Sequence, residues 1–263
     1  MLKHKHLITE TRMKKLIYFL LLFTTMIFLT PASSNAEEEK NFSGSAALGV
    51  YSNYVWRGLK LSKGVVIQPS VTATYYGVSA NLWANYDTDL EEANETDYTL
   101  SYSHSFGKIS LTPGYIYYSL DGIPDTQELY LSISADVILK PTFTWYYDFD
   151  AGNGSFLVLS IGHSFALPKN IALNLVGSLS YTAGNELMGT DESGGDLNDF
   201  YNGEIYVSAS IPVWKAISIE PKLAYSFALS DASETIITNI IDANDYDGDS
   251  NIVYGGVNFL VSF

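Results

Sequence analysis

The chain has 263 residues, with 14 Lys and Arg against 29 Asp and Glu, so its formal net charge is −15 at pH 7. A chain this acidic offers no basic face for phosphates, which argues against nucleic acid as a partner. The lack of Cys excludes a disulfide framework, a thiolate nucleophile and a Cys-ligated metal centre. Tyr and Gly, at 20 residues each, are plentiful, and this composition favours strands and turns.

Residues 1–36 have the pattern of a secretory signal peptide. Two lysines precede the apolar run Leu16–Leu29, and small residues lead to a predicted cleavage point after Ala36. The alternative is a membrane anchor, but these 14 apolar residues are fewer than the roughly 20 that cross a bilayer. Met13 is a second candidate start. Cleavage leaves a short acidic segment, 37–41, ahead of the main domain, 42–263, and gives the exported chain a net charge of −19.

Twelve segments alternate between apolar and polar side chains, which is the period of a β-strand. In the first of them the even positions carry apolar residues such as Leu48 and Val50, while the odd positions carry polar or small residues. In chain order the predicted strands are Phe42–Gly58, Val65–Tyr75, Val78–Asp87, Tyr98–Phe106, Ile109–Tyr118, Gln127–Val137, Pro141–Phe149, Phe156–Phe165, Ile171–Ala183, Tyr201–Ile211, Ile217–Phe227 and Ile252–Phe263.

The connections between these segments also alternate, between short and long. Every second connection is short, and four of these five short connections contain one Lys. The others are mostly longer and hold 21 of the 28 carboxylates of the exported chain, over the ranges 87–97, 121–125, 148–155, 184–200 and 230–251. Only the first connection, Leu59–Lys63, is short and basic instead.

Both alternations together predict an all-β fold, a closed antiparallel transmembrane β-barrel of about 12 strands. Hydrocarbon offers no hydrogen-bond partners, so strands cross it only as a closed sheet, apolar toward lipid and polar toward the lumen. An even strand number, with long loops on one rim and short turns on the other, is typical of bacterial outer-membrane barrels. We therefore expect long acidic extracellular loops and short periplasmic turns. The alternative, a soluble β-barrel or sandwich, gives no reason to separate loop length and charge by rim.

Four segments of the sequence form a recognisable set: Ser52–Gly58, followed by Ser62 and Gln68–Ser70, then Asn81–Tyr86 and Thr112–Tyr118. Together they resemble the TorF-like family of outer-membrane porins. The chain departs from the family at Leu59–Leu61, where the family more often has a Ser-rich step. The last strand ends on Phe263 and is similar to the C-terminal strand of outer-membrane barrels, whose final aromatic residue is an assembly signal. The resemblance implies a fold and a location, and it transfers no catalytic residues.

Five charged residues are candidates for lining the lumen. Arg57 is the single Arg left after signal removal, and we expect it on the lumen side of the first strand. Glu128, Glu204, Glu220 and Lys222 fall on the polar phase of their strands, and Lys222 is expected to reach Glu204 diagonally. Two interpretations remain open: an interior ion network that plugs the barrel, or a constriction that selects solutes.

The sequence gives only weak signals for metal binding and for catalysis. Asp245, Asp247 and Asp249 are a weak candidate site for a divalent cation, because clustered oxygens suit Ca²⁺. Their spacing does not fit an EF-hand, and a solvated acidic loop is the simpler interpretation. His104 and His163 lie near short turns on the apolar phase, as expected of residues at the membrane interface. We expect no enzyme activity and no cofactor.

These features predict a porin-like channel in the outer membrane of a Gram-negative bacterium. It would pass small hydrophilic solutes by diffusion, with a preference for cations drawn by the acidic rim. Expected partners are outer-membrane lipid and lipopolysaccharide, the barrel assembly machinery and the solutes themselves. The alternative function is that of a closed barrel acting as an adhesin or surface scaffold through its acidic loops.

Overall fold

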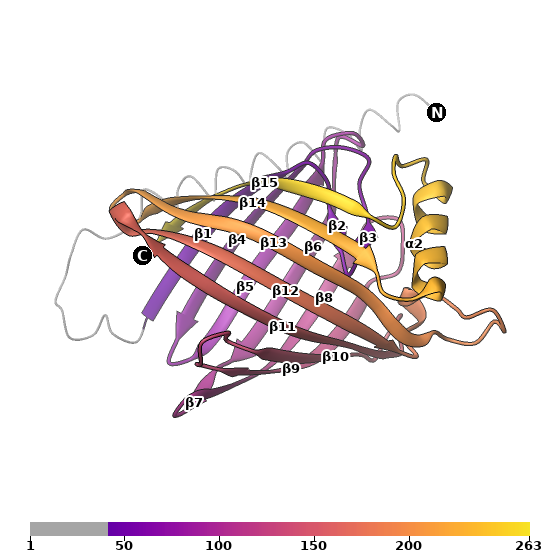
Figure 1. The fold of residues 1–263 in the computed structure, drawn as a ribbon, viewed down its shortest axis with the longest axis horizontal. Helices are drawn as coiled ribbons and strands as arrows, with labels where there is room; N and C mark the ends of the chain where they lie inside the picture. Colours follow the sequence, from indigo (N-terminus) through magenta and orange to yellow (C-terminus); the bar gives the residue numbers. More distant parts are fainter. Residues whose placement is uncertain (1–41) are drawn as a thin grey trace.

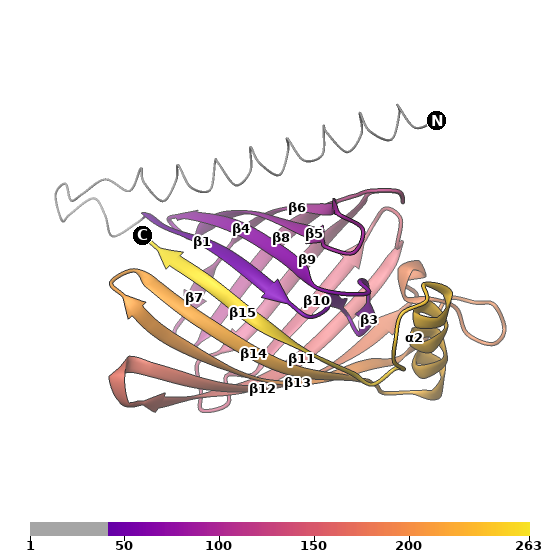
Figure 2. The same ribbon diagram turned by 90° about the horizontal axis from the view of Figure 1, so that it is seen from above.

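A single antiparallel sheet of twelve strands closes on itself in the computed structural model, which describes residues 42–263 (Figures 1 and 2). The predicted signal peptide and the segment 37–41 lie outside the described residues. The strands are β1 (Phe42–Tyr51), β4 (Val66–Tyr75), β5 (Val78–Asp87), β6 (Glu92–Tyr102), β8 (Ile109–Leu120), β9 (Thr126–Ala135), β10 (Thr142–Asp148), β11 (Gly154–Leu167), β12 (Ile171–Ala183), β13 (Asn198–Trp214), β14 (Ile217–Ala228) and β15 (Ile252–Ser262). The short β7 (His104–Phe106) continues β6 beyond Ser103.

The barrel closes between its first and last strands. β1 pairs with β4 on one side and with β15 on the other, in a register that runs from Ser45 opposite Ser262 to Tyr51 opposite Gly256. The backbone of the C-terminal Phe263 exchanges two hydrogen bonds with Gly44, of 2.6 and 2.9 Å. Among the described strands no edge is left unpaired, as hydrocarbon requires of a sheet that spans it.

The apolar phase of the strands faces outward, as predicted for a membrane barrel. On β6, Tyr98 and Leu100 are 52% and 55% exposed, while Asp97 and Thr99, at the alternate positions, point to the lumen and are less accessible. A soluble barrel has the opposite arrangement, since its apolar side chains fill the interior. Within residues 42–263, no helix is long and apolar enough to cross a membrane.

The two rims differ in the way the sequence indicates. At the short-turn rim, on the left in Figure 1, β4 and β5 are joined by Tyr76 and Gly77, whose φ angles of 49° and 83° form a tight two-residue turn. The 3-10 helix η2 (Pro168–Asn170) joins β11 and β12 at this rim. The long-loop rim carries the connection of residues 184–197, with the 3-10 helix η3 (Glu186–Met188), and the helix α2 (Asp231–Ala243). One predicted loop is wrong: residues 87–97 belong mostly to β5 and β6, and only residues 88–91 connect them.

The first connection differs most from its prediction. β1 ends at Tyr51 rather than at Gly58, and residues 52–65 form a loop that contains a small hairpin of β2 (Val55–Trp56) and β3 (Leu59–Lys60). The apolar and polar alternation continues through this loop, but Tyr54, on the predicted lipid-facing phase, is buried, with 9% exposure, instead of facing lipid. A strand prediction based on alternation alone cannot distinguish these two destinations for an apolar side chain.

The helix α2 was predicted as part of an acidic loop. It begins after Ser230, which forms a capping box with Ser233, and Ile237 and Ile241 on its inner face are fully buried. Figures 1 and 2 show it lying across the long-loop end of the barrel, beside β3. The helix therefore covers the mouth that the hairpin occupies.

Candidate functional site

The hairpin of β2 and β3 is the central feature of the lumen. Its turn is formed by Arg57 and Gly58, with φ angles of 51° and 83°, the conformation of a tight two-residue hairpin turn. The turn reaches β13, because a Cβ added to Gly58 would lie 2.7 Å from the Cβ of Asn202. Glycine is required here by both the backbone angle and this close approach.

Arg57 lies at the tip of this hairpin, so its predicted place on the first strand is wrong, although it does enter the lumen. Its Nη2 donates to Glu128 Oε2 on β9 over 2.7 Å, and the two side chains are 8% and 1% exposed. The Tyr118 hydroxyl donates to the same oxygen over 2.8 Å. The strand β9 lies on the far side of the barrel from β1, so this ion pair holds the hairpin across the lumen.

Aromatic rings surround the Arg57 guanidinium. Its central carbon lies 4.4 Å from the Trp56 ring centre, 4.5 Å from that of Phe156 and 4.9 Å from that of Tyr146. Cation–π contacts of this kind stabilise a desolvated cation by up to about 2 kcal/mol. The Arg57–Glu128 pair is thus enclosed, so removing one partner would leave an uncompensated buried charge and would cost more than breaking an exposed ion pair.

Two further carboxylates belong to this lumen site and were missed from the sequence. Glu95 and Asp97 lie on the lumen side of β6, within the residues 87–97 that the sequence predicts as an acidic loop. The Tyr54 hydroxyl hydrogen bonds Glu95. Among the described residues, Asp97 Oδ1 and Arg57 Nη1 are buried without a hydrogen-bond partner. Their lumen position follows from the register, which sets Asp97 opposite Tyr118.

The other predicted lumen residues form a second group on β13, β14 and β15. Lys222 Nζ lies 3.4 Å from Glu204 Oε1, which confirms the predicted diagonal pair. The Tyr254 hydroxyl donates to Glu204 Oε2 over 2.6 Å, and Lys222 also lies over the Tyr206 ring at 4.3 Å. Glu220 accepts a hydrogen bond from the Ser210 hydroxyl. These residues line the lumen wall but do not contact the Arg57–Glu128 pair.

An apolar cluster packs the hairpin against the helix at the long-loop mouth. Leu59 of the hairpin packs in one buried cluster with Ile237 and Ile241 of α2, together with residues of the barrel wall that include Phe156, Tyr201 and Tyr254. Polar contacts tie the same segments together: Lys60 Nζ donates to the backbone oxygen of Asp247, and Lys63 Nζ lies 3.4 Å from Asp245 Oδ2. The hairpin is thus held between the lumen wall and the helix.

The candidate cation ligands near residue 247 are not brought together. Asp245 faces Lys63, Asp247 offers its backbone oxygen to Lys60, and Asp249 accepts from the backbone N–H of Asn251. Within the described part of the chain, no three Asp, Glu, His or Cys side chains group in a way that could hold a metal ion.

Space remains in the lumen outside the hairpin. One cavity of about 330 Å³ is lined by hydroxyl and aromatic side chains of β6, β8, β9 and β10, among them Thr112, Ser132 and Thr144. A second, of about 180 Å³, lies beside the hairpin between Tyr54, Gln68 and Lys222. The lumen is therefore polar and only partly filled.

The fold and this lumen define a closed twelve-stranded barrel of the outer-membrane type. The chain is similar to the NanC porin, with a TM-score of 0.52 and 13% identity, over 84% of this chain and 98% of that one. It is also matched to an outer membrane channel from Pseudomonas putida F1 (TM-score 0.40, 11% identity, 89% and 100% covered) and to Salmonella typhi OmpF (TM-score 0.37, 10% identity, 88% and 100% covered). The first of these likenesses supports the fold. No protein-family model and no curated protein sequence matches the chain, so the TorF-like resemblance stays a prediction.

Proposed function

We propose that this protein is an outer-membrane channel for the passive diffusion of small hydrophilic solutes, with a preference for cations, and that the hairpin of residues 55–60 sets its aperture. The observation that carries the proposal is a polar, partly empty lumen crossed by one hairpin, which a single buried ion pair holds in place. A barrel that served only as a scaffold has no need of hydroxyl-lined space in its interior.

The charges of the lumen support the cation preference. Carboxylates outnumber cationic groups on the lumen side of the barrel. The carboxylates include those of Glu95, Asp97, Glu128, Glu204 and Glu220, and the cations include Arg57 and Lys222. A narrow passage with low-dielectric walls concentrates the field of such a surplus, which attracts cations and repels anions.

The hairpin supports a narrow aperture. It occupies the lumen at the long-loop end, and α2 covers it there. Because Arg57 joins the hairpin to the far wall of the lumen, we expect the width of the passage to depend on this contact. The channel is therefore predicted to conduct weakly with the hairpin in place and strongly once it leaves.

The orientation and assembly of the barrel follow from the same proposal. The long-loop rim would face outward and contact lipopolysaccharide, while the short turns would face the periplasm. Phe263 would be read by the barrel assembly machinery. Its ring packs against Gly44 at the seam of the barrel, and 43% of the side chain stays exposed. A TorF-like family membership and a cleaved signal peptide fit this location. We assign no catalytic role to the protein.

The test is the conductance of the refolded protein in a planar bilayer under a salt gradient. The proposal predicts small discrete current steps, with a reversal potential that shows cation preference. Glu220→Gln should weaken this preference, because it removes a lumen carboxylate. The matched control Glu234→Gln, on an exposed position of α2, should leave it unchanged.

A folded barrel that never conducts, shown by its heat-modifiable migration on gels, would contradict the channel. The apolar mouth cluster would then be a permanent plug, and the long loops would become the functional surface, as in the alternative of an adhesin or scaffold. Steps without ion preference would contradict only the cation selectivity.

A further inference from the structure

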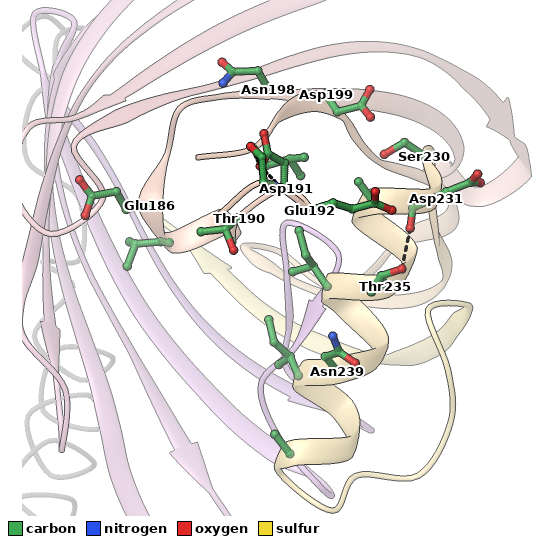
Figure 3. A pocket seen from close by; sticks show the side chains of 18 of the residues that line it. Glu186, Thr190, Asp191, Glu192, Asn198, Asp199, Ser230, Asp231, Thr235 and Asn239 are labelled. Carbon is green, nitrogen blue, oxygen red and sulfur yellow. Dashed lines mark hydrogen bonds between the residues drawn. The ribbon is translucent and has the colours of Figure 1, made fainter. Parts of the chain in front are cut away.

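A large cleft lies among the loops at the long-loop rim, outside the lumen. We call it the loop cleft: it is a space of about 1240 Å³ between residues 186–199 and α2 (Figure 3). Small-molecule sites commonly measure about 300–1,000 Å³, so this volume suits a ligand larger than a simple solute. The cleft shares no lining residue with the Arg57–Glu128 site.

The polar lining of the loop cleft carries charge of one sign. Five carboxylates line it and no Lys, Arg or His does; they belong to Glu186, Asp191, Glu192, Asp199 and Asp231. Asp191 is held by the Ser193 hydroxyl and by backbone N–H groups, which lower the pKa of its carboxyl, so it stays ionised. No hydrogen bond from another described residue reaches the carboxylates of Glu192 and Asp231. Their full charge therefore remains for a ligand.

The helix supplies an apolar floor. Ala232, Ile236, Ile240 and Ala243 follow one another at helical spacing along the side of α2 that lines the cleft. Ile237 and Ile241 are fully buried in the mouth cluster, whereas Ala232, Ile236 and Ile240 pack against the edge of that cluster and are only partly buried. The α2 helix thus has two apolar faces, of which one is buried in the barrel and the other is only partly covered.

Hydrogen bonds within the protein fix the walls of the loop cleft, so the cleft is preformed. The connection of residues 184–197 is closed by backbone hydrogen bonds from Gly184 to Leu197, from Leu197 to Gly189 and from Asp191 to Gly195. Ile236 packs on Gly189, where an added Cβ would lie 3.0 Å from the isoleucine. A ligand would therefore lose little affinity to ordering these loops.

We propose that the loop cleft binds a basic amphipathic peptide, with its apolar side chains on the Ile236 and Ile240 face and its amines against the five carboxylates. Charge complementarity identifies this occupant, since the charged side chains that line the cleft are all acidic and its floor is apolar. A bare metal ion does not fit, because the carboxylates do not converge as ligands. The inference does not depend on whether the lumen conducts.

Binding can be measured by the fluorescence anisotropy of a labelled ten-residue peptide of Lys and Leu, with its leucines on one helical face. The protein is placed in nanodiscs of zwitterionic lipid, and binding to empty discs is subtracted. Glu192→Gln with Asp231→Asn should weaken binding at least tenfold. The control pair Asp89→Asn with Glu91→Gln removes the same charge from the same rim, outside the cleft, and should change binding less than twofold.

Two further measurements separate the cleft from general attraction to an acidic surface. A peptide of Lys and Ser with equal charge should bind at least tenfold more weakly, and Ile240→Thr should weaken the Lys and Leu peptide. Heat-modifiable migration confirms that each variant is folded. Equal weakening by both charge pairs, equal binding of the two peptides, or binding explained entirely by empty discs would each overturn the proposal.

Discussion

Replacing Arg57 by Ala tests how firmly the hairpin is held in the lumen. The substitution leaves Glu128 in a site where its side chain is 1% exposed, with the Tyr118 hydroxyl as its remaining partner. Breaking a buried ion pair by removing one partner costs about 3–5 kcal/mol, and the lost contacts with three aromatic rings add to this. The hairpin can avoid that cost by leaving the lumen, which admits water to Glu128.

This free-energy cost determines the fraction of channels in which the hairpin has left the lumen. Each 1.4 kcal/mol is a factor of about ten, so 3–5 kcal/mol raises the population with the hairpin displaced by about 100-fold to 4,000-fold. Single-channel recording should show this as long-lived openings of high conductance in Arg57→Ala. Arg57→Lys keeps the charge but loses the planar stacking, and it should fall between the wild type and Arg57→Ala.

The matched control is Lys63→Ala, on the same loop. Lys63 pairs with Asp245 over 3.4 Å, and both side chains are exposed, so this pair contributes about 0–1 kcal/mol. The control should change the population by about fivefold or less. If Arg57→Ala gives the same currents as Lys63→Ala and the wild type, the Arg57–Glu128 pair does not hold the aperture and the reasoning is refuted.

Three other predictions concern the barrel and its loops. Gly256→Ala should lower the free energy of unfolding in urea by about 1–3 kcal/mol, because its Cβ would lie 2.1 Å from the backbone oxygen of Val50 at the seam; Gly177→Ala, with open space around it, should be neutral within about 1 kcal/mol. Ile237→Ala should cost about 2–5 kcal/mol locally, seen as faster proteolysis of α2 in an intact barrel; unchanged cleavage would show that the helix does not depend on the mouth cluster. Ser193→Ala should raise the pKa of the Asp191 carboxyl toward its usual range, measured by NMR titration. Because folding lowers the pKa of the Asp191 carboxyl, its ionised form stabilises the fold. This stabilisation is complete above the ordinary pKa of about 3.9 and is lost as the pH falls through the lowered pKa. If Asp191 titrates in Ser193→Ala as it does in the wild type, the prediction is contradicted.

The barrel could be predicted because its signals are periodic and repeat. Alternation along each strand and the contrast between the two rims recur around the chain, so an error of a few residues at one strand end leaves the prediction intact. The diagonal contact of Lys222 with Glu204 was within reach for the same reason, since strand register follows from neighbouring segments.

The hairpin could not be predicted from alternation, because a strand facing lipid and a loop packing in the mouth both place apolar side chains at every second residue. The signal that was available is the Arg57–Gly58 step, a turn sequence inside an overlong strand of 17 residues. A strand that crosses a bilayer needs only about 9–11 residues, so the excess length itself indicated a separate element.

The helix α2 and the lumen carboxylates Glu95 and Asp97 of β6 were not predicted, because both lie in segments rich in Asp and Glu. Residues 230–251 and 87–97 were assigned as loops because carboxylates cluster there. Ser230 followed by isoleucines four residues apart, at 237 and 241, is nevertheless a helix signal. Glu95 and Asp97 alternate with outward residues in phase with the rest of β6, and counting that phase back from Tyr98 would have placed them in the lumen.

The central claim is that the lumen conducts and that the hairpin limits it. The most direct measurement compares the single-channel conductance of the wild type with a variant in which residues 53–64 are replaced by a short Gly-Ser linker, both verified as folded barrels. We expect a several-fold larger, cation-preferring conductance for the variant. If the variant is as silent as, or no more conductive than, the wild type, the hairpin does not set the aperture and the lumen is closed by other means.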